Sequence, residues 1–136
     1  MKEPLLSVVI PAFNEEKRIC RTLDEVTLYL KHQSYTWEII VIDDGSLDNT
    51  AGQVHKWAKQ SSFDHNVRVQ TVPHAGKGWA IKHGMLAANG QYRFMCDADL
   101  AMPISQLHAF LDKIKEGFDV VIGSRELPGA KRFGES

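Results

Sequence analysis

The sequence has few cysteines, no long apolar run and no excess of basic residues. Its two cysteines, Cys20 and Cys96, lack the spacing of a disulfide framework or a zinc site, and they fit a reducing compartment. No signal peptide opens the chain, and no apolar stretch approaches the roughly 18 residues of a membrane span. The net charge of −1, from 16 basic and 17 acidic residues, gives no basic surface for nucleic acid. The 136 residues, 43% of them hydrophobic, suit one globular domain with one core.

Two common nucleotide-binding signatures are also missing. Neither Gly-x-Gly-x-x-Gly nor Gly-x-x-x-x-Gly-Lys-Ser/Thr occurs in the chain. Their absence disfavours a dinucleotide-binding fold and P-loop hydrolysis. Without a P-loop, a metal ion would have to supply more of the charge neutralisation of a bound diphosphate.

Short apolar segments alternate along the chain with segments of helical periodicity. The predicted strands are residues 5–10, 38–42, 67–72, 92–96 and 119–125, with the third at the periphery of the sheet. Pro11 is expected to end the first strand because proline cannot donate to the ladder. This alternation predicts a single domain over residues 1–136 of α/β class. It has a doubly wound, mainly parallel sheet with helices on both faces.

Apolar residues at helical spacing predict which face of each helix is buried. Asn14 is expected to cap the first helix, and Asp48 the second. The predicted inward residues are Ile19, Leu23, Val26 and Leu30 in the first helix, Ala51, Val54 and Ala58 in the second, Ile81, Met85 and Ala88 in the third, and Ile104, Leu107, Leu111 and Ile114 in a fourth that starts at Pro103.

Two carboxylates, Asp97 and Asp99, follow the fourth predicted strand and are separated by Ala98. Positions i and i+2 of a strand share a face, so both side chains set out in the same direction. Two anions 4 Å apart repel by roughly 4 kcal/mol at an effective dielectric constant of 20, and a divalent cation removes this penalty. Mg²⁺ and Mn²⁺ prefer such oxygen ligands. Alone, the pattern also fits a solvated acidic turn; the rest of the chain favours a metal site.

Polar clusters follow the other predicted strands as well. They are Asn14-Glu15, Asp43-Asp44, Gly76-Lys77-Gly78 and Arg125. Ligands of doubly wound sheets bind at the carboxyl ends of the strands, so we expect all the clusters to line one crevice. The glycine-rich loop can present backbone N–H groups and a lysine to an anion, and the acidic pair can accept hydrogen bonds from a base or ribose. Each cluster also has a plain structural alternative, as a helix-terminal charge, a turn former or a solvated loop residue.

Three segments resemble the family 2 glycosyltransferases of GT-A fold: residues 7–15, residues 41–50 and Asp97-Ala98-Asp99. Residues 76–86, together with Gly123-Ser124-Arg125, are most similar to the dolichyl-phosphate β-glucosyltransferase branch, and the dolichyl-phosphate mannosyltransferases are the next match. The resemblance runs from about Leu5 to Arg125, which is nearly the whole chain.

The resemblance implies a role for each matched residue. The nucleoside pocket would be lined by Pro11, Ala12, Phe13 and Glu15, with Asp44 on the base, Asp43 nearby and Lys77 beside the donor. Asp97 would contact ribose or metal-bound water, with Ala98 next to it in the substrate site. Asp99 would hold Mg²⁺ or Mn²⁺ on the diphosphate, and Arg125 would face the diphosphate or an acceptor phosphate. The predicted catalytic residues are therefore Asp99 and Arg125, and the predicted metal ligands are Asp97 and Asp99.

The implied reaction is an inverting, metal-dependent hexosyl transfer from a nucleotide sugar to a polyprenyl or dolichyl phosphate, in the cytoplasm or at the cytoplasmic face of a membrane. UDP-glucose is favoured as the donor, with GDP-mannose next. Such enzymes continue past the position of Arg125 with an acceptor-side half, so the chain is expected to be the N-terminal part of a longer enzyme. Two alternatives stay open: a family 2 enzyme with another acceptor, and a non-catalytic nucleotide-sugar-binding domain. A response-regulator receiver domain fits less well, because its acidic pair follows the first strand.

Overall fold

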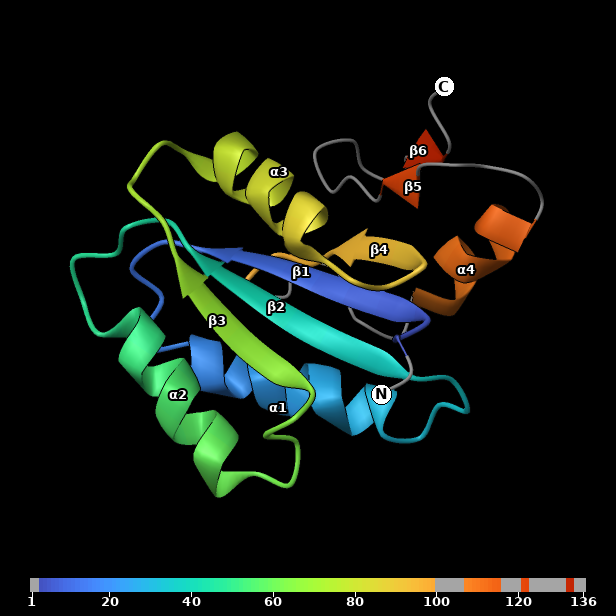
Figure 1. The fold of residues 1–136 in the computed structure, drawn as a ribbon, viewed down its shortest axis with the longest axis horizontal. Coiled ribbons are helices and arrows are strands. Elements are labelled where there is room, and N and C mark those ends of the chain that lie inside the picture. Colours follow the sequence, from blue (N-terminus) through green and yellow to red (C-terminus); the bar gives the residue numbers. More distant parts are fainter. Residues whose placement is uncertain (1–2, 100–106, 116–120, 123–131, 134–136) are drawn as a thin grey trace.

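A computed structural model of the chain describes residues 3–99, 107–115, 121–122 and 132–133. Its main sheet has four parallel strands in the order β3-β2-β1-β4. The strands are β1 (Leu6–Ala12), β2 (Trp37–Asp43), β3 (Val67–Thr71) and β4 (Tyr92–Met95). Helices α1 (Ile19–Leu30) and α2 (Thr50–Gln60) lie on one face of the sheet and α3 (Lys77–Ala87) on the other (Figure 1). The predicted α/β fold and the edge position of the third strand are thus confirmed.

Strand β1 continues through Pro11 to Ala12, so the prediction that this proline ends the strand is wrong. In a parallel ladder, alternate residues direct their backbone groups to opposite neighbours. The carbonyl of Ala12 accepts the N–H of Asp44 on the β2 side, whereas the carbonyl of Val9 accepts the N–H of Cys96 on the β4 side. Pro11 therefore faces the β4 side, where pairing has already ended at Val9, and its missing N–H costs no ladder bond.

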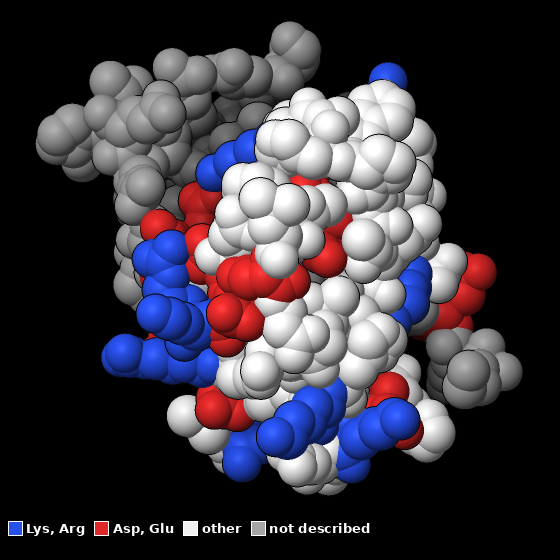
Figure 2. Space-filling view, turned by 90° about the vertical axis from the view of Figure 1, so that its left-hand side faces the viewer, with Lys and Arg blue, Asp and Glu red and all other residues white. Residues whose placement is uncertain are grey.

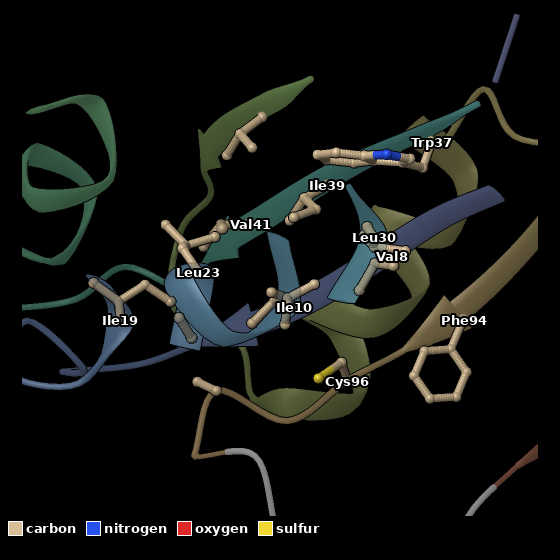
Figure 3. Packing of buried hydrophobic residues seen from close by; sticks show 14 of the residues in the cluster. Val8, Ile10, Ile19, Leu23, Leu30, Trp37, Ile39, Val41, Phe94 and Cys96 are labelled. Carbon is tan, nitrogen blue, oxygen red and sulfur yellow. The ribbon is translucent and has the colours of Figure 1, made fainter. Parts of the chain in front are cut away.

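The core has one part on each face of the sheet, and strand β1 contributes to both. Val8 and Ile10 pack against α1 and α2, and Val9 packs under α3. Figure 3 shows the first two among side chains of α1. The buried face of α1 is the predicted one: Ile19, Leu23, Val26 and Leu30 are all fully buried.

Helix α3 approaches the sheet through small residues rather than through the large ones that were predicted. Ala80 and Gly84 are its buried residues, and Ile81 is only partly buried. Of the other predicted residues, Ala88, directly after the helix, is buried as predicted, and Met85 is partly buried against the core. A Cβ atom at Gly84 would lie 2.3 Å from Cγ1 of Val9. The prediction missed Ala80 and Gly84 because apolar residues surround this helix, so their spacing does not single out one face.

The chain's last described elements are α4 (Leu107–Lys115), β5 (Val121–Ile122) and β6 (Arg132–Phe133). Leu107 is buried and Leu111 packs on the core, as predicted, whereas Ile104 and Pro103 lie outside the described residues. The described part of the predicted fifth strand pairs antiparallel with β6 and does not extend the main sheet. In the described part of the chain, no helix has the length and apolarity needed to cross a membrane.

A buried carboxylate, Glu38, ties the amino ends of the strands to the segment after α3. It accepts hydrogen bonds from Ser7 Oγ at 2.5 Å, from the N–H of Asn89 at 2.7 Å and from the Arg68 guanidinium. Ser7 Oγ in turn accepts the N–H of Gly90 at 2.7 Å. Burial acts to raise the pKa of Glu38, but these hydrogen bonds outweigh it and the pKa is lowered from its ordinary value.

We expect Glu38→Gln to lower the free energy of unfolding at neutral pH by roughly 1–3 kcal/mol, because charge-assisted hydrogen bonds are lost. Because the pKa of Glu38 is lowered in the folded state, its carboxylate stabilises the folded protein above the ordinary pKa of 4.5. This stabilisation is lost as the pH falls through the folded-state pKa. The difference between wild type and variant should therefore shrink in acid. Urea unfolding across a pH series measures this. Glu25→Gln is the control, since its partner Arg21 is exposed; a gap that widens in acid would contradict the assignment.

Candidate functional site

A pocket of about 310 Å³ lies at the carboxyl ends of β1, β2 and β4. It is lined by Pro11, Ala12, Phe13, Glu15, Asp44, His74, Gly76, Lys77, Ala80, Asp97, Ala98 and Asp99. The structure thus brings together the predicted clusters that follow β1, β2, β3 and β4. Figure 2 looks at this edge of the molecule and shows acidic side chains near its centre, with lysine and arginine side chains beside them. Arg125 lies outside the described residues.

The segment after β4 is held in place by α1 and α3. The buried Ala98 offers its carbonyl to the Thr22 hydroxyl of α1. Asp97 makes an ion pair with Lys77, the first residue of α3. Asp99 follows at an exposed turn. The Asp-x-Asp pair is therefore supported by both layers of helices.

The pocket carries an excess of negative charge. Its described lining includes four carboxylates, from Glu15, Asp44, Asp97 and Asp99, against one lysine. Arg18 lies next to Glu15, with a guanidinium nitrogen 2.7 Å from its Oε1. The hydrogen bond and charge of Glu15 raise the pKa of Arg18, and the charge of Asp99 adds a smaller contribution. A diphosphate would be repelled here unless a further cation entered with it.

The donor set fits Mg²⁺ or Mn²⁺. Asp97 and Asp99 supply hard oxygen atoms. The ammonium group of Lys77 pairs with Asp97, so one of these carboxylates already binds a positive charge. Among the described residues there is no cluster of three or more histidine, cysteine or acidic side chains with metal-binding geometry. Two carboxylates without a protein cage match the way Mg²⁺ is held together with substrate phosphates.

The loops after β1 and β2 are bonded to each other at the rim of the pocket. The prediction that Asn14 caps α1 is wrong, because that helix begins only at Ile19. Instead its backbone is left-handed, with φ 54°, its N–H donates to Ser46 Oγ at 2.9 Å, and its Oδ1 accepts the N–H of Leu47 at 2.8 Å.

Two more residues extend this hydrogen-bonded joint between the loops after β1 and β2 toward α1. The N–H of Glu15 donates to Thr50 Oγ1 at 2.9 Å, and the N–H of Glu16 donates to Asp48 Oδ2 at 3.2 Å. Asp48 also accepts the N–H of Thr50 at 3.1 Å, but the N-cap of α2 is Asn49, so the prediction that Asp48 caps this helix is wrong. The two loops therefore form one hydrogen-bonded unit that carries Phe13 and Glu15 at the pocket.

Asp44 is buried, and its carboxylate is already in use. Its Oδ1 accepts the N–H of Ala75 at 2.9 Å, and its Oδ2 accepts the N–H of Gly76 at 3.1 Å and faces His74 Nδ1 at 2.9 Å. The glycine-rich loop was expected to offer N–H groups to an anion. These two N–H groups do so, but the anion is Asp44 of the protein itself.

Asp43 is not among the residues that line the pocket. Its Oδ1 accepts the N–H of Ser46 at 3.0 Å and its Oδ2 accepts the hydroxyl of Thr71 at 3.2 Å. These bonds hold the turn at Gly45, whose φ of +66° favours glycine. The carboxylate of Asp43 thus shapes the loop that positions Asp44.

Sequence reasoning missed two lining residues, His74 and Ala80, whereas Gly76 belongs to a predicted cluster. The His74 ring stacks on Phe13, with centroids 4.4 Å apart and an interplanar angle of 24°. A signal was present, because a histidine directly after a strand on the ligand-binding edge of the sheet belongs with the other clusters.

Comparison with known proteins identifies similar sequences over nearly the whole chain. The family model described as Glycosyl transferase family 2 matches residues 7–135. A dolichyl-phosphate beta-glucosyltransferase of Trichomonas vaginalis is 41% identical over 133 residues, which cover 90% of this chain and 40% of that protein. The chain spans about 40% of the length of the curated relatives that it matches first.

Two solved structures share the fold at 26% sequence identity. A mannosyltransferase of Pyrobaculum calidifontis in complex with GDP-Man and Mn²⁺ has a TM-score of 0.61, and the match covers 90% of this chain and 35% of that one. A glucosyl-3-phosphoglycerate synthase of Mycobacterium tuberculosis in complex with UDP has a TM-score of 0.62, with 87% of this chain and 42% of that one covered.

Proposed function

The chain belongs to glycosyl transferase family 2, as its motifs predicted, and from this membership we propose that it binds the donor in a metal-dependent hexosyl transfer to a polyprenyl phosphate. The observation that carries the proposal is the pocket in which Asp97, Ala98 and Asp99 meet the loops after β1, β2 and β3. Similarity to dolichyl-phosphate beta-glucosyltransferases supports the acceptor class and favours UDP-glucose over GDP-mannose. Residues 1–136 would form the donor-binding domain of that enzyme.

In this proposal each side of the pocket takes one part of the donor. Pro11, Ala12, Phe13 and Glu15 would surround the nucleoside, with Asp44 at its base end and Asp43 supporting the loop. Asp97 and Asp99 would hold Mg²⁺ or Mn²⁺, and the Mn²⁺ in the mannosyltransferase neighbour supports a divalent ion. That ion would neutralise the diphosphate and stabilise it as it departs. Lys77 lies beside the same point and would contact the diphosphate from α3.

The acceptor chemistry explains why no strong base is required. A phosphate monoester carries up to two negative charges near neutral pH, so it is already a nucleophile. Attack on the face opposite the leaving diphosphate inverts the anomeric carbon and gives a β-linked product from an α-linked donor. Arg125 would steer the acceptor phosphate by charge-assisted hydrogen bonds. We place the reaction at the cytoplasmic face of a membrane, where a polyprenyl phosphate can meet a nucleotide sugar.

A second candidate is a family 2 enzyme with another acceptor. The structural similarity to a glucosyl-3-phosphoglycerate synthase supports it, because that name gives a soluble phosphorylated acceptor on the same fold. A domain that only binds a nucleotide sugar is the third candidate.

Incubation with radiolabelled UDP-glucose, Mn²⁺ and a short polyprenyl phosphate separates these candidates. We expect the full-length product of the gene to transfer the label to the lipid in β linkage, and residues 1–136 alone to bind the donor but to transfer it poorly. Label found only on a soluble sugar or protein would refute the lipid acceptor and leave the second candidate. Donor binding without transfer to any acceptor would leave the third.

A further inference from the structure

Helix α3 carries apolar residues on both its inner and its outer side. Its inner residues Ala80 and Gly84 are buried, whereas Trp79 and Leu86 are 48% and 74% exposed. Trp79, Lys82 and Leu86 are three and four residues apart, so they follow one line along the helix, here called the outer stripe of α3. A helix that is apolar all round is normally buried on all sides. The outer stripe therefore has the character of a contact surface.

The segment that builds this side of the molecule has no acidic residue. Residues 65–96 include β3, α3 and β4 and contain no aspartate or glutamate, although the chain has 17 acidic residues. The basic residues of the segment are Arg68, Lys77, Lys82 and Arg93. Two of them form ion pairs with carboxylates from outside the segment, Arg68 with Glu38 and Lys77 with Asp97. The charges of the other two are left to attract an anionic partner.

Lys82 and Arg93 lie at the two ends of the outer stripe. Within the residues that the structure describes, neither forms an ion pair. The Lys82 ammonium lies 5.9 Å from the centroid of the Trp79 ring. The Arg93 guanidinium donates to the carbonyl of Met85 at 2.5 Å, next to Leu86 in the chain. Each end of the stripe thus combines an exposed apolar side chain with a cation.

We propose that the outer stripe of α3 docks on the anionic surface of a membrane. Trp79 and Leu86 enter the headgroup layer, the level at which tryptophan is enriched in membrane proteins, and Lys82 and Arg93 bind the negatively charged headgroups. A second copy of the chain fits this surface less well, because a symmetric contact through α3 would bring two copies of Lys82 together.

The position of α3 connects this surface with the candidate site. Helix α3 lies alone on its face of the main sheet among the helices that cover that sheet in the described residues (Figure 1). Lys77 and Ala80, on either side of Trp79 in the chain, line the pocket. Docking would hold the pocket beside the membrane, where a polyprenyl phosphate presents its phosphate. In this respect the inference rests on the proposed function, whereas the membrane contact itself does not require it.

Sedimentation with lipid vesicles tests the proposal on the chain of 136 residues. We expect it to bind vesicles of phosphatidylcholine with about 30% phosphatidylserine, less so at high salt, and to bind pure phosphatidylcholine vesicles far more weakly. Lys82→Gln should weaken binding to the anionic vesicles about 5-fold, the effect of one charge near the surface. Lys59→Gln is the control and should bind as the wild type does, because it removes an exposed charge from α2 on the opposite face of the sheet.

Tryptophan fluorescence tests which face touches the lipid. Trp79 is exposed, whereas Trp37 is buried in the core and Trp57 lies on α2, where its ring N–H donates to Asp24. Lipids brominated in their acyl chains should quench the fluorescence of the wild type when it is bound to anionic vesicles. Trp79→Phe keeps an apolar ring at this position, so it should still bind the vesicles but lose most of the quenching.

Several results would overturn the docking surface: no binding to anionic vesicles, equal binding by the wild type and Lys82→Gln, or quenching that survives in Trp79→Phe. Self-association without lipid that Lys82→Gln strengthens would assign the stripe to a second copy instead. Calorimetry with UDP and with GDP in Mn²⁺ keeps the two proposals apart, and both variants should bind nucleotide as the wild type does. Nucleotide binding without vesicle binding refutes only the docking surface, and vesicle binding without nucleotide binding refutes only the donor function.

Discussion

If Asp99 holds a metal as proposed, replacing it with asparagine is expected to remove the metal dependence of nucleotide binding together with most of the affinity. Loss of groups that only support a metal ligand typically costs 10–100-fold, so loss of a ligand should weaken UDP binding on the order of 100-fold, about 2.7 kcal/mol. Asparagine has nearly the same shape as aspartate, and position 99 is an exposed turn, so the fold should survive the change. Calorimetric titration with UDP in Mn²⁺ and again in EDTA measures both effects.

The control for this experiment is Asp64→Asn, which removes the same charge from an exposed position in the loop between α2 and β3. It should bind UDP as the wild type does, and it should remain sensitive to EDTA. Equal affinity of the wild type in Mn²⁺ and in EDTA would contradict a metal role for Asp97 and Asp99, whatever the variants do.

The second large effect is expected from Gly84→Ala, which should destabilise the protein although alanine is the better helix former. In an exposed helix this change would stabilise by about 1 kcal/mol. Here the new methyl group would lie 2.3 Å from Cγ1 of Val9 and 2.9 Å from Cγ1 of Ile42, and both side chains are fully buried in the sheet. Overpacking of this kind costs about 1–3 kcal/mol, so the net effect should be a lower free energy of unfolding.

Gly78→Ala, in the same helix, provides the matched control. Apart from its chain neighbours and the backbone of its own helix, a Cβ atom at Gly78 would meet nothing within 4 Å, so this variant should be neutral or slightly more stable than the wild type. Urea unfolding of the three proteins compares the two positions directly. If both alanine variants gain stability, α3 does not approach the sheet as closely as the structure has it.

The alternation of strands and helices, the buried face of α1 and the edge of the sheet that carries the candidate site could be predicted because each depends on a local pattern. Leu23 and Leu30 follow helical spacing, and Asp97 follows an apolar run, so neighbours in sequence were sufficient. The buried face of α3 was missed because close packing through Ala80 and Gly84 depends on what the sheet presents to it. Small residues allow the helix to come close to the sheet, and the spacing of large hydrophobic residues does not indicate where this happens.

The errors at Pro11 and Asn14 have a similar origin. Whether a proline ends a strand depends on which neighbour its nitrogen faces, and pairing with β4 had already ended at Val9. Whether an asparagine caps a helix depends on what else its side chain can bond, and here the backbone of Leu47 competes successfully. His74 was missed because its partners, Phe13 and Asp44, lie in the loops after two other strands.

The hydrogen-bonded joint between the loops after β1 and β2 has a consequence for engineering and for evolutionary exchange. Asn14 and Glu15 on one loop are matched to Ser46, Leu47 and Thr50 on the other. A chimaera that imports only one of these loops would leave donors and acceptors of the other unmatched at the rim of the pocket. Altered nucleotide preference should therefore be transplanted with both loops as a cassette, and recombination that separates them should be selected against.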